Sequence, residues 1–312
     1  MPDRPLVSAI MPLFRHERHV GEAFASMLAQ DYEPLEIVVV DNCSTDRSFA
    51  IVEEMTSAYR GPHRITLHRN ERNIFGNSNN VLMQLSTGAF LVVFHSDDVA
   101  RVDRVSRLVA VWQETGALLL ASNGTLIDDN GLPLRPFFEP GTAFRTDAKG
   151  IAAIGYQRGL HGATFAHTRA VMEHFPPWDA EWSPTQTDII VPFRAALLGR
   201  VHIVDEPLLS IRTHPATVSW LVNDAGITDP QARREGVLAA EMGQVLALLA
   251  ELNHPTGRAA AGPRFGKLQD TLLVRLASLG GRWTRVRNRM LMRDLLPNWG
   301  PRVPVPASPP GA

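Results

Sequence analysis

Two adjacent carboxylates, Asp97 and Asp98, directly follow His95-Ser96 at the end of the apolar run of residues 89–94. Such a short run, rich in Val, Leu and Phe, is typical of a buried strand, so the acids would lie where that strand meets solvent. The two carboxylates repel each other unless a cation lies between them and an anionic ligand. Hard divalent ions suit this arrangement. The structural alternative is that an Asp-Asp pair begins a helix favourably through the helix dipole.

A further acid, Asp41, ends the apolar run of residues 35–40. In an open parallel sheet, an acid at that strand end is placed to accept hydrogen bonds from a nucleoside. Asp46, a few residues later, is explained by helix capping alone. An acid at this position would also fit a dinucleotide-dependent oxidoreductase. Such an enzyme needs a G-x-G-x-x-G sequence after its first strand, and residues 11–20 contain no glycine. The pattern therefore disfavours an oxidoreductase.

Two other residues, Asp188 and His214, would indicate a functional site only if the fold brings them close to Asp97 and Asp98. Asp188 follows Thr187 at the start of an expected helix, and His214 follows the apolar run of residues 208–211. Taken singly, Asp188 fits a helix-start acid and His214 fits a surface histidine. The residues alone leave both interpretations open.

The elements that must position these side chains alternate along the chain. Buried strands are predicted at residues 6–11, 35–40, 65–68, 89–94, 117–121, 201–204 and 208–211. Helices are predicted around residues 20–28, 51–58, 102–112 and 187–198. This alternation predicts an α/β fold with a mostly parallel mixed sheet, helices on both faces, and ligands at the carboxyl ends of the strands.

The character of the chain changes beyond residue 220. Apolar residues recur on one helical face over residues 238–252 and again over residues 268–279, which predicts a C-terminal helical appendage over residues 221–300. Residues 301–312 are rich in proline and are expected to be disordered. The α/β domain is expected to occupy residues 1–220.

Composition narrows the class of protein. The 312 residues include 31 Lys and Arg against 32 Asp and Glu, so no overall field favours nucleic acid. Cys43 is the single cysteine, which suits a reducing compartment. Residues 1–5 lack a signal-peptide pattern, and no apolar stretch approaches 18 residues. We therefore expect a cytoplasmic location.

Several motifs, in order, resemble glycosyltransferase family 2 of the GT-A fold. The opening strand and nucleotide loop of the family resemble residues 7–14 (VSAIMPLF), and its "SxxxQxYxxxE" helix end resembles residues 25–36 (ASMLAQDYEPLE). Three further family motifs resemble residues 39–46 (VVDNCSTD), 73–80 (NIFGNSNN) and 95–98 (HSDD). The resemblance extends from residue 5 to about 220 and is firmest up to residue 112. It implies a nucleotide-binding half over about 1–112 and an acceptor half over about 113–220.

The resemblance also implies roles for individual residues. Nucleotide binding falls to Pro12, Leu13, Phe14, Asp41, Asn42, Asn73 and Asp97. Asp98 would hold Mn²⁺ or Mg²⁺ on the diphosphate, with Asp97 beside it, and His214 would complete the metal site or touch the diphosphate. Asp188 matches the general base of the family.

Three residues depart from the family pattern. His95 stands where the family often has the first acid of its metal motif, Thr187 stands for the Glu before the base, and Asn42 replaces a common second Asp. The change at Asn42 weakens the inference that the nucleotide is UDP, so GDP and dTDP donors stay open.

The implied activity is that of an inverting hexosyltransferase-like enzyme. It would move a sugar from a nucleoside-diphosphate sugar to a hydroxyl of a saccharide or lipid-linked acceptor, in polysaccharide or glycoconjugate biosynthesis of the bacterial type. One alternative is a nucleotide-sugar-binding protein that has lost catalysis. Another is a nucleotidyltransferase, although a basic Gly-rich loop after the first strand is missing.

The partner of the appendage is left open by the sequence. Residues 264–293 carry eight basic residues beside the apolar stripe of Leu268, Leu272, Leu276 and Leu279. Such a helix could lie on an anionic membrane surface. It could equally pack on the catalytic domain or on a second subunit, because amphipathic helices in globular proteins usually face a core.

Overall fold

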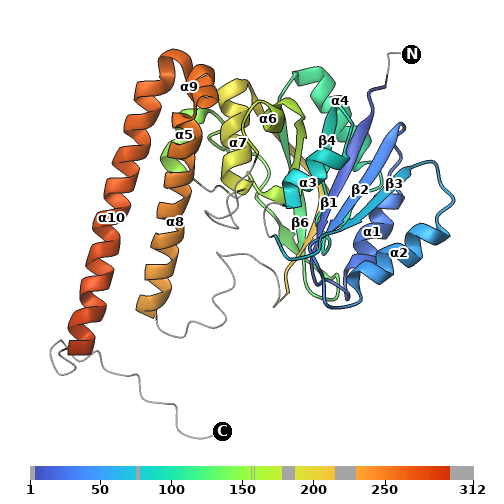
Figure 1. Cartoon of the computed structure of the whole chain (residues 1–312), viewed down its shortest axis with the longest axis horizontal. Helices are drawn as coiled ribbons and strands as arrows, with labels where there is room; N and C mark the ends of the chain where they lie inside the picture. The colour runs from blue at the N-terminus through green and yellow to red at the C-terminus, as the bar shows by residue number, and fades with distance from the viewer. Residues whose placement is uncertain are drawn as a thin grey trace, which may run out of the picture.

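The computed structural model describes residues 4–74, 78–155, 157, 159–177, 187–214 and 230–295, the side chains of 187, 230–236, 239–240 and 286–295 apart. Within these ranges one nine-stranded sheet runs in the order β3-β2-β1-β4-β8-β6-β9-β5, and β7 pairs with β6. Helices lie on both faces of the sheet, and a long helical hairpin lies outside them (Figure 1). The predicted α/β architecture with a helical appendage is confirmed.

The first half of the sheet is parallel. It contains β1 (Val7–Leu13), β2 (Leu35–Asp41), β3 (Arg64–Arg69) and β4 (Phe90–Val93). The crossovers are α1 (Val20–Leu28), α2 (Ser48–Ala58) and α3 (Ser78–Leu85). Alternate residues of β1 face opposite sides: Ala9 packs in the core that includes α1, whereas Ile10 packs in the cluster that includes α3.

The second half of the sheet is mixed. Its strands are β5 (Val99–Ala100), β6 (Leu119–Ile127), β7 (Pro133–Pro136), β8 (Phe165–Thr168) and β9 (Val201–Arg212). β8 lies antiparallel between β4 and β6, and β9 is parallel to β6. The two strands predicted at residues 201–204 and 208–211 are one strand, because a register shift beside Asn123 accommodates Pro207 without ending the pairing.

Further helices cover the mixed half. They are α4 (Arg104–Thr115), α5 (Ala148–Ile154), α6 (Ala170–Glu173) and α7 (Thr187–Leu198). α4 packs in the same core as α1 and α2, where the ring of Trp112 stacks on Phe90 with centroids 4.5 Å apart. α5, α6 and α7 share the core on the opposite face.

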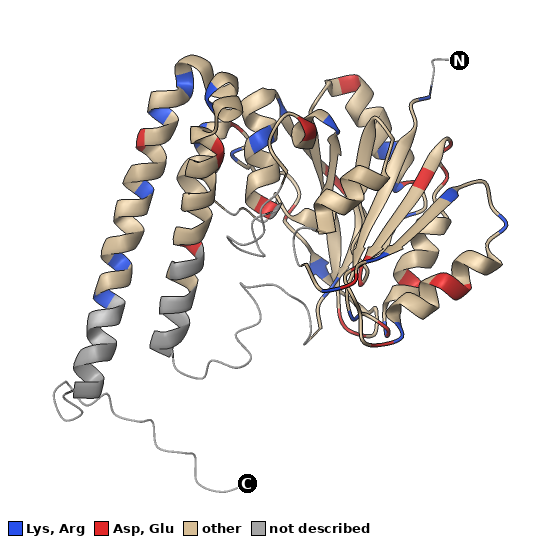
Figure 2. Ribbon diagram, viewed as in Figure 1, with Lys and Arg blue, Asp and Glu red and all other residues tan. Residues whose placement is uncertain are grey.

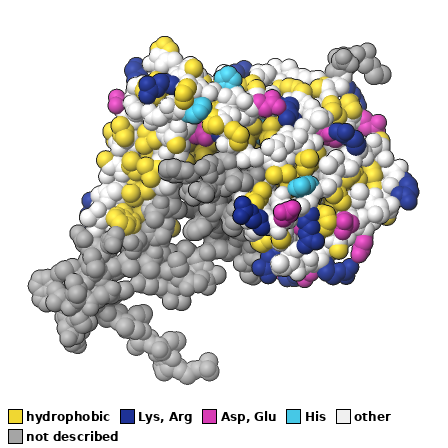
Figure 3. All heavy atoms as spheres, in the orientation of Figure 1, with side chains coloured by type: hydrophobic (Ala, Val, Ile, Leu, Met, Phe, Trp, Pro, Cys, Tyr) yellow, Lys and Arg dark blue, Asp and Glu magenta, His cyan; other side chains and the backbone are white. Residues whose placement is uncertain are grey.

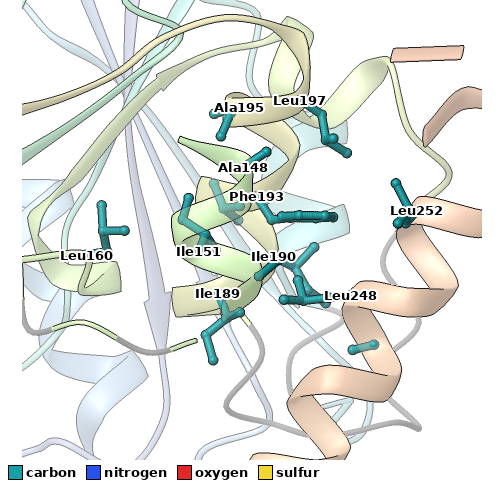
Figure 4. Packing of buried hydrophobic residues seen from close by; sticks show 14 of the residues in the cluster. Ala148, Ile151, Leu160, Ile189, Ile190, Phe193, Ala195, Leu197, Leu248 and Leu252 are labelled. Carbon is teal, nitrogen blue, oxygen red and sulfur yellow. The ribbon is translucent and has the colours of Figure 1, made fainter. Parts of the chain in front are cut away.

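Three C-terminal helices form the appendage: α8 (Pro230–Asn253), α9 (Pro255–Ala261) and α10 (Phe265–Leu295). Leu248 and Leu252 of α8 lie toward Ile190 and Phe193 of α7 (Figure 4). Leu268, Leu272 and Leu279 of α10 are buried in the same core. The apolar stripe is therefore buried against the chain itself, in a core that α10 shares with α5, α7 and α8. Contact of the appendage with a membrane surface or a second subunit stays a prediction.

Two basic residues of the appendage, Arg264 and Arg275, donate hydrogen bonds to helices of the α/β domain. Lys and Arg residues are spaced along the described part of α10 (Figure 2). Arg264 donates to the carbonyl of Leu197 at 2.7 Å, at the C-terminal end of α7, and Arg275 donates to the carbonyl of Ala152 at 3.3 Å. A cation at a helix C-terminus is favourable, so Arg264 stabilises the end of α7.

Some hydrophobic side chains of the hairpin remain on the surface (Figure 3). Leu246, Leu273 and Val274 are exposed. Scattered apolar side chains of this kind are normal on soluble folds. Among the described residues, no helix is both long enough and apolar enough to cross a membrane.

A buried ion pair joins α7 to α8. The guanidinium of Arg194 is 1% exposed and donates to both carboxylate oxygens of Glu251, at 2.7 and 2.8 Å. The same guanidinium donates to the carbonyl of Pro176 and lies over the ring of Phe175. Two planar groups in this paired geometry hold the helices in one register.

Glu251→Ala should lower the free energy of unfolding by about 3 kcal/mol, because it leaves a buried guanidinium without its anion. Urea unfolding measures the change. The matched control is Glu173→Ala, which removes the carboxylate of the exposed Arg169–Glu173 pair and should cost less than about 1 kcal/mol. Equal effects of the two substitutions would contradict a structural role for the Arg194–Glu251 pair.

Candidate active site

The carboxyl ends of the central strands meet at one edge of the sheet, as predicted. The backbone N–H of Asn42, just after β2, donates to the carbonyl of Leu13 at the end of β1, at 2.8 Å. The N–H of Phe94, just after β4, donates to the carbonyl of Ile10 at 2.8 Å. The residues that follow β1, β2 and β4 are therefore held beside one another.

Asp97 lies at the centre of a group of histidines. Its side chain is 11% exposed, and its Oδ2 lies 3.1 Å from Nε2 of His214 and 3.9 Å from Nε2 of His16. His95 belongs to a further group with Asp97 and Asp98. One carboxylate thus faces imidazoles from the ends of β1, β4 and β9.

The charge state of Asp97 follows from this surrounding. Burial by itself would raise the pKa of Asp97, but the hydrogen bond with His214 and the nearby His16 and His95 lower it to about 2. Burial lowers the pKa of His95 to about 4. At neutral pH an ionised carboxylate therefore lies beside a neutral His95 imidazole, a combination that suits metal ligation.

Asp98 has a different environment from its neighbour. Its Oδ1 accepts the backbone N–H of Arg212 at 2.8 Å, and its Oδ2 lies 3.9 Å from Nδ1 of His95. Burial and the charge of Asp97 raise the pKa of Asp98 well above the usual range of a carboxyl group. One oxygen of Asp98 is thus tied to β9, whereas Asp97 faces the histidines.

Arg212, the last residue of β9, connects the loops around this centre. Its guanidinium is 2% exposed and donates to the backbone carbonyls of Asp97, Asp128 and Asp129, at 3.0, 3.3 and 3.1 Å. It also pairs with Glu22 of α1 at 2.6 Å. The Arg212 side chain therefore ties the loop after β4, the loop after β6 and helix α1 to β9.

A second group of possible ligands adjoins the first. Nε2 of His19 lies 3.0 Å from Oδ1 of Asp129, and the ring of His19 lies 4.8 Å from that of His214. His16, His19 and Asp129 were not among the sites predicted from the sequence. The signal that could have found the histidines is their spacing of three residues in the loop that leads into α1.

Three sets of side chains have the chemistry and separation of metal ligands: His16-Asp97-His214, His19-Asp129-His214 and His95-Asp97-Asp98. Within each set the ligand atoms lie within 4.8 Å of one another. Imidazole nitrogens and carboxylate oxygens are ordinary ligands of divalent metal ions, so this donor set fits such an ion. Of the two predicted metal residues, Asp98 belongs to one of these sets and His214 to two.

The predicted nucleotide residues at the end of β2 are engaged within the chain. Asp41 is fully buried, where it accepts hydrogen bonds from the backbone N–H of Ser44, at 3.0 Å, and from the hydroxyl of Ser44. It also forms an ion pair with Nε of Arg69 at 3.2 Å. Asn42 donates to Oδ1 of Asn73 at 2.5 Å and accepts the N–H of Ile74 at 2.8 Å. These bonds shape the loops after β2 and β3.

At the end of β1, Pro12 and Phe14 are half-buried, whereas the side chain of Leu13 is fully buried in the core beneath α1. Strand alternation turns the side chain of Leu13 to the face opposite those of Pro12 and Phe14. Leu13 can reach a ligand through its backbone alone.

Asp188 lies at the start of α7. Its Oδ1 accepts the N–H of Gly162 at 2.8 Å, and its Oδ2 lies 4.0 Å from Nε2 of His161. The ring of His161 lies 6.1 Å from that of His95. A Cβ on Gly162 would lie 2.6 Å from Asp188, so this close approach requires glycine. Two further acids that precede Asp188 in the sequence, Asp179 and Glu181, lie outside the described residues.

A cavity of about 110 Å³ lies beside these residues. Pro12 of β1, His95 after β4, and Gly162 beside Asp188 all line it. The cavity therefore touches His95 of the Asp97 group and the glycine that binds Asp188.

Comparison with known proteins agrees with this geometry. The sequence model of the family described as "Glycosyl transferase family 2" matches residues 8–167. An uncharacterized glycosyltransferase of Nostoc sp. is 25% identical over 215 residues, covering 67% of this chain and 65% of that protein. The succinoglycan biosynthesis protein ExoO of Rhizobium meliloti is 31% identical over 136 residues, covering 43% and 38%. The matches thus span less than two thirds of these relatives.

Solved structures share the fold. The structure of Staphylococcus aureus TarS 1–349 in complex with UDP has a TM-score of 0.57 at 20% identity, covering 87% of this chain and 72% of that one. The mannosyltransferase PcManGT from Pyrobaculum calidifontis, in complex with GDP-Man and Mn²⁺, has a TM-score of 0.54 at 15% identity, covering 96% and 82%. The fold is therefore of the GT-A class, and the chain belongs to glycosyl transferase family 2.

Arg212→Lys should lower the free energy of unfolding by about 2 kcal/mol or more, because a lysine keeps the charge but cannot reach three carbonyls and Glu22 together. Arg47→Lys is the control: the Arg47 side chain is 70% exposed in its pair with Glu54, so the same change there should cost less than about 1 kcal/mol. Urea unfolding of both variants tests this. An Arg212→Lys variant as stable as the parent would mean that Arg212 does not fix these loops.

Proposed function

We propose that the chain is an inverting glycosyltransferase that moves a sugar from a nucleoside-diphosphate sugar to an acceptor hydroxyl. The observation that carries the proposal is one cavity lined both by His95, which lies beside Asp97, and by Gly162, whose N–H donates to Asp188. A donor bound along the carboxyl edge of the sheet would present its diphosphate to the Asp97 group and its sugar to Asp188. Pro12, Phe14 and the loops built by Asp41, Asn42 and Asn73 would bind the nucleoside.

We assign the primary metal contact to Asp97, with His214 beside it, and a supporting contact to Asp98. The sequence places Asp98 first, but Oδ1 of Asp98 already accepts the N–H of Arg212. When bound there, a divalent ion would stabilise the charge that develops on the leaving diphosphate. The Mn²⁺ in the PcManGT complex supports a metal in this fold.

Asp188 is the proposed general base. A carboxylate that accepts the proton of the acceptor hydroxyl allows a single displacement at the anomeric carbon, and a single displacement inverts its configuration. The N–H of Gly162 holds one oxygen of Asp188, and His161 lies beside the other. These two contacts fix the orientation of the Asp188 carboxylate.

The biological setting is proposed from relatives. ExoO is named for succinoglycan biosynthesis, and TarS is named as a poly(ribitol-phosphate) β-N-acetylglucosaminyltransferase. These names support a saccharide or polymer acceptor in polysaccharide biosynthesis. The neighbours were solved with UDP, UDP-GlcNAc or GDP-Man, so UDP- and GDP-sugars are the first donors to test.

Asp188→Asn should lower turnover by about 10² or more while donor affinity changes little, because the amide keeps the shape of the side chain and loses its basicity. Turnover is measured by release of nucleoside diphosphate, with the product identified by mass. Asp270→Asn, an exposed change on α10, is the control and should behave as the parent. Near-normal turnover of Asp188→Asn would place the base elsewhere, and release of pyrophosphate would instead indicate a nucleotidyltransferase.

Asp97→Asn should abolish the metal-dependent part of donor binding, because the carboxylate charge that faces the imidazoles is lost. Thermal shift with UDP- and GDP-sugars, with and without Mn²⁺, measures this. Asp31→Asn changes an exposed acid and should leave the shift intact. The metal assignment fails if Asp97→Asn keeps the full Mn²⁺-dependent shift.

A further inference from the structure

Three histidines from distant parts of the sequence meet at the candidate site. His16 lies in the loop after β1, as does His19, and His214 follows β9. The rings of His16 and His214 are 5.6 Å apart in an edge arrangement, and those of His19 and His214 are 4.8 Å apart and tilted. The loop after β1 therefore contributes nitrogen atoms to a place where the sequence pattern alone indicates carboxylates.

The separations within this group suit a single ion. Nε2 of His214 is 3.1 Å and Nε2 of His16 is 3.9 Å from the same oxygen of Asp97. Ligands bound about 2.1 Å from a tetrahedral ion lie about 3.4 Å from one another. Only small movements of the side chains would bring these three atoms to ligand distances.

The orientation of His16 is set by a neighbour. Its Nδ1 lies 2.8 Å from Oγ of Ser96, which leaves Nε2 to face Asp97. Metal-binding histidines commonly have the second ring nitrogen held in this way, which fixes the ring and its tautomer. His19 is held in turn by Asp129, whose other oxygen pairs with Arg18 at 2.8 Å. His16 is thus arranged as a ligand, and His19 packs against the ring of His214.

We propose that His16, Asp97 and His214 form a metal site of two imidazoles and one carboxylate that binds one later transition ion, such as Co²⁺ or Zn²⁺, in preference to Mg²⁺. The inference deepens the proposed function, on which it rests for the use of Asp97 at the diphosphate. Imidazole nitrogen suits these ions, whereas Mg²⁺ prefers oxygen ligands and retains its water. His16 is the residue that makes the site rich in nitrogen.

The test is direct ion binding to the full chain after chelation, followed by calorimetry with Co²⁺ and Mg²⁺ and by the visible absorption of bound Co²⁺. We expect one Co²⁺ per chain, bound about 100-fold or more tighter than Mg²⁺. His16→Ala should weaken Co²⁺ binding by about tenfold or more and Mg²⁺ binding by less than about twofold. Added imidazole should partly restore the Co²⁺ spectrum of this variant.

The matched control is His174→Ala, because His174 is an exposed histidine at the end of α6, away from this group. Its Co²⁺ affinity should equal that of the parent. Thermal unfolding without metal checks that His16→Ala retains the fold. Co²⁺ and Mg²⁺ affinities within about threefold of each other, unchanged Co²⁺ binding by folded His16→Ala, or two Co²⁺ per chain would each overturn the inference.

The binding test and the activity test fail separately. Sugar transfer without any preference for Co²⁺ over Mg²⁺ would overturn the metal site of His16 and leave the glycosyltransferase proposal standing. If Co²⁺ is strongly preferred and the preference depends on His16, but the chain transfers no sugar from any donor, the metal site stands and the glycosyltransferase proposal fails.

Discussion

The buried guanidinium of Arg212 fixes the segments that form the site. It donates to backbone carbonyls after β4 and after β6 and pairs with Glu22 of α1. The backbone N–H of Arg212 donates to Asp98. A buried charge is tolerable only when its donors are satisfied, so the surrounding loops are held to the positions that satisfy them. The position of His214, two residues further on, follows from that of Arg212.

The consequence of this arrangement is an electrostatic division between two adjacent acids. Asp98 accepts a backbone N–H and has a raised pKa, whereas Asp97 faces imidazoles and has a pKa lowered to about 2. The negative charge of the pair is therefore concentrated on Asp97. The two residues are chemically identical, and only their surroundings give them different tasks.

The C-terminal helices stabilise α7, the helix at whose start Asp188 lies. Glu251 of α8 pairs with Arg194 of α7, and Arg264 binds the carbonyl at the end of α7. Leu248 and Leu252 add apolar contacts with the same helix (Figure 4). Because Asp188 begins α7, the appendage stabilises the helix that carries the proposed base.

The sequence by itself determined the alternation of strands and helices, the strand ends at which Asp41 and Asp97 lie, and the helical appendage. These features depend on local periodicity, which is present in any window of the sequence. Local patterns could not reveal that β8 lies antiparallel between β4 and β6, or that residues 201–212 form one strand. Nor could they bring His16 to Asp97 and His214, or turn Leu13 into the core while Pro12 lines the cavity. Those outcomes were decided by the tertiary structure, because they depend on contacts between residues far apart in the sequence, such as Glu22 and Arg212, which are 190 positions apart.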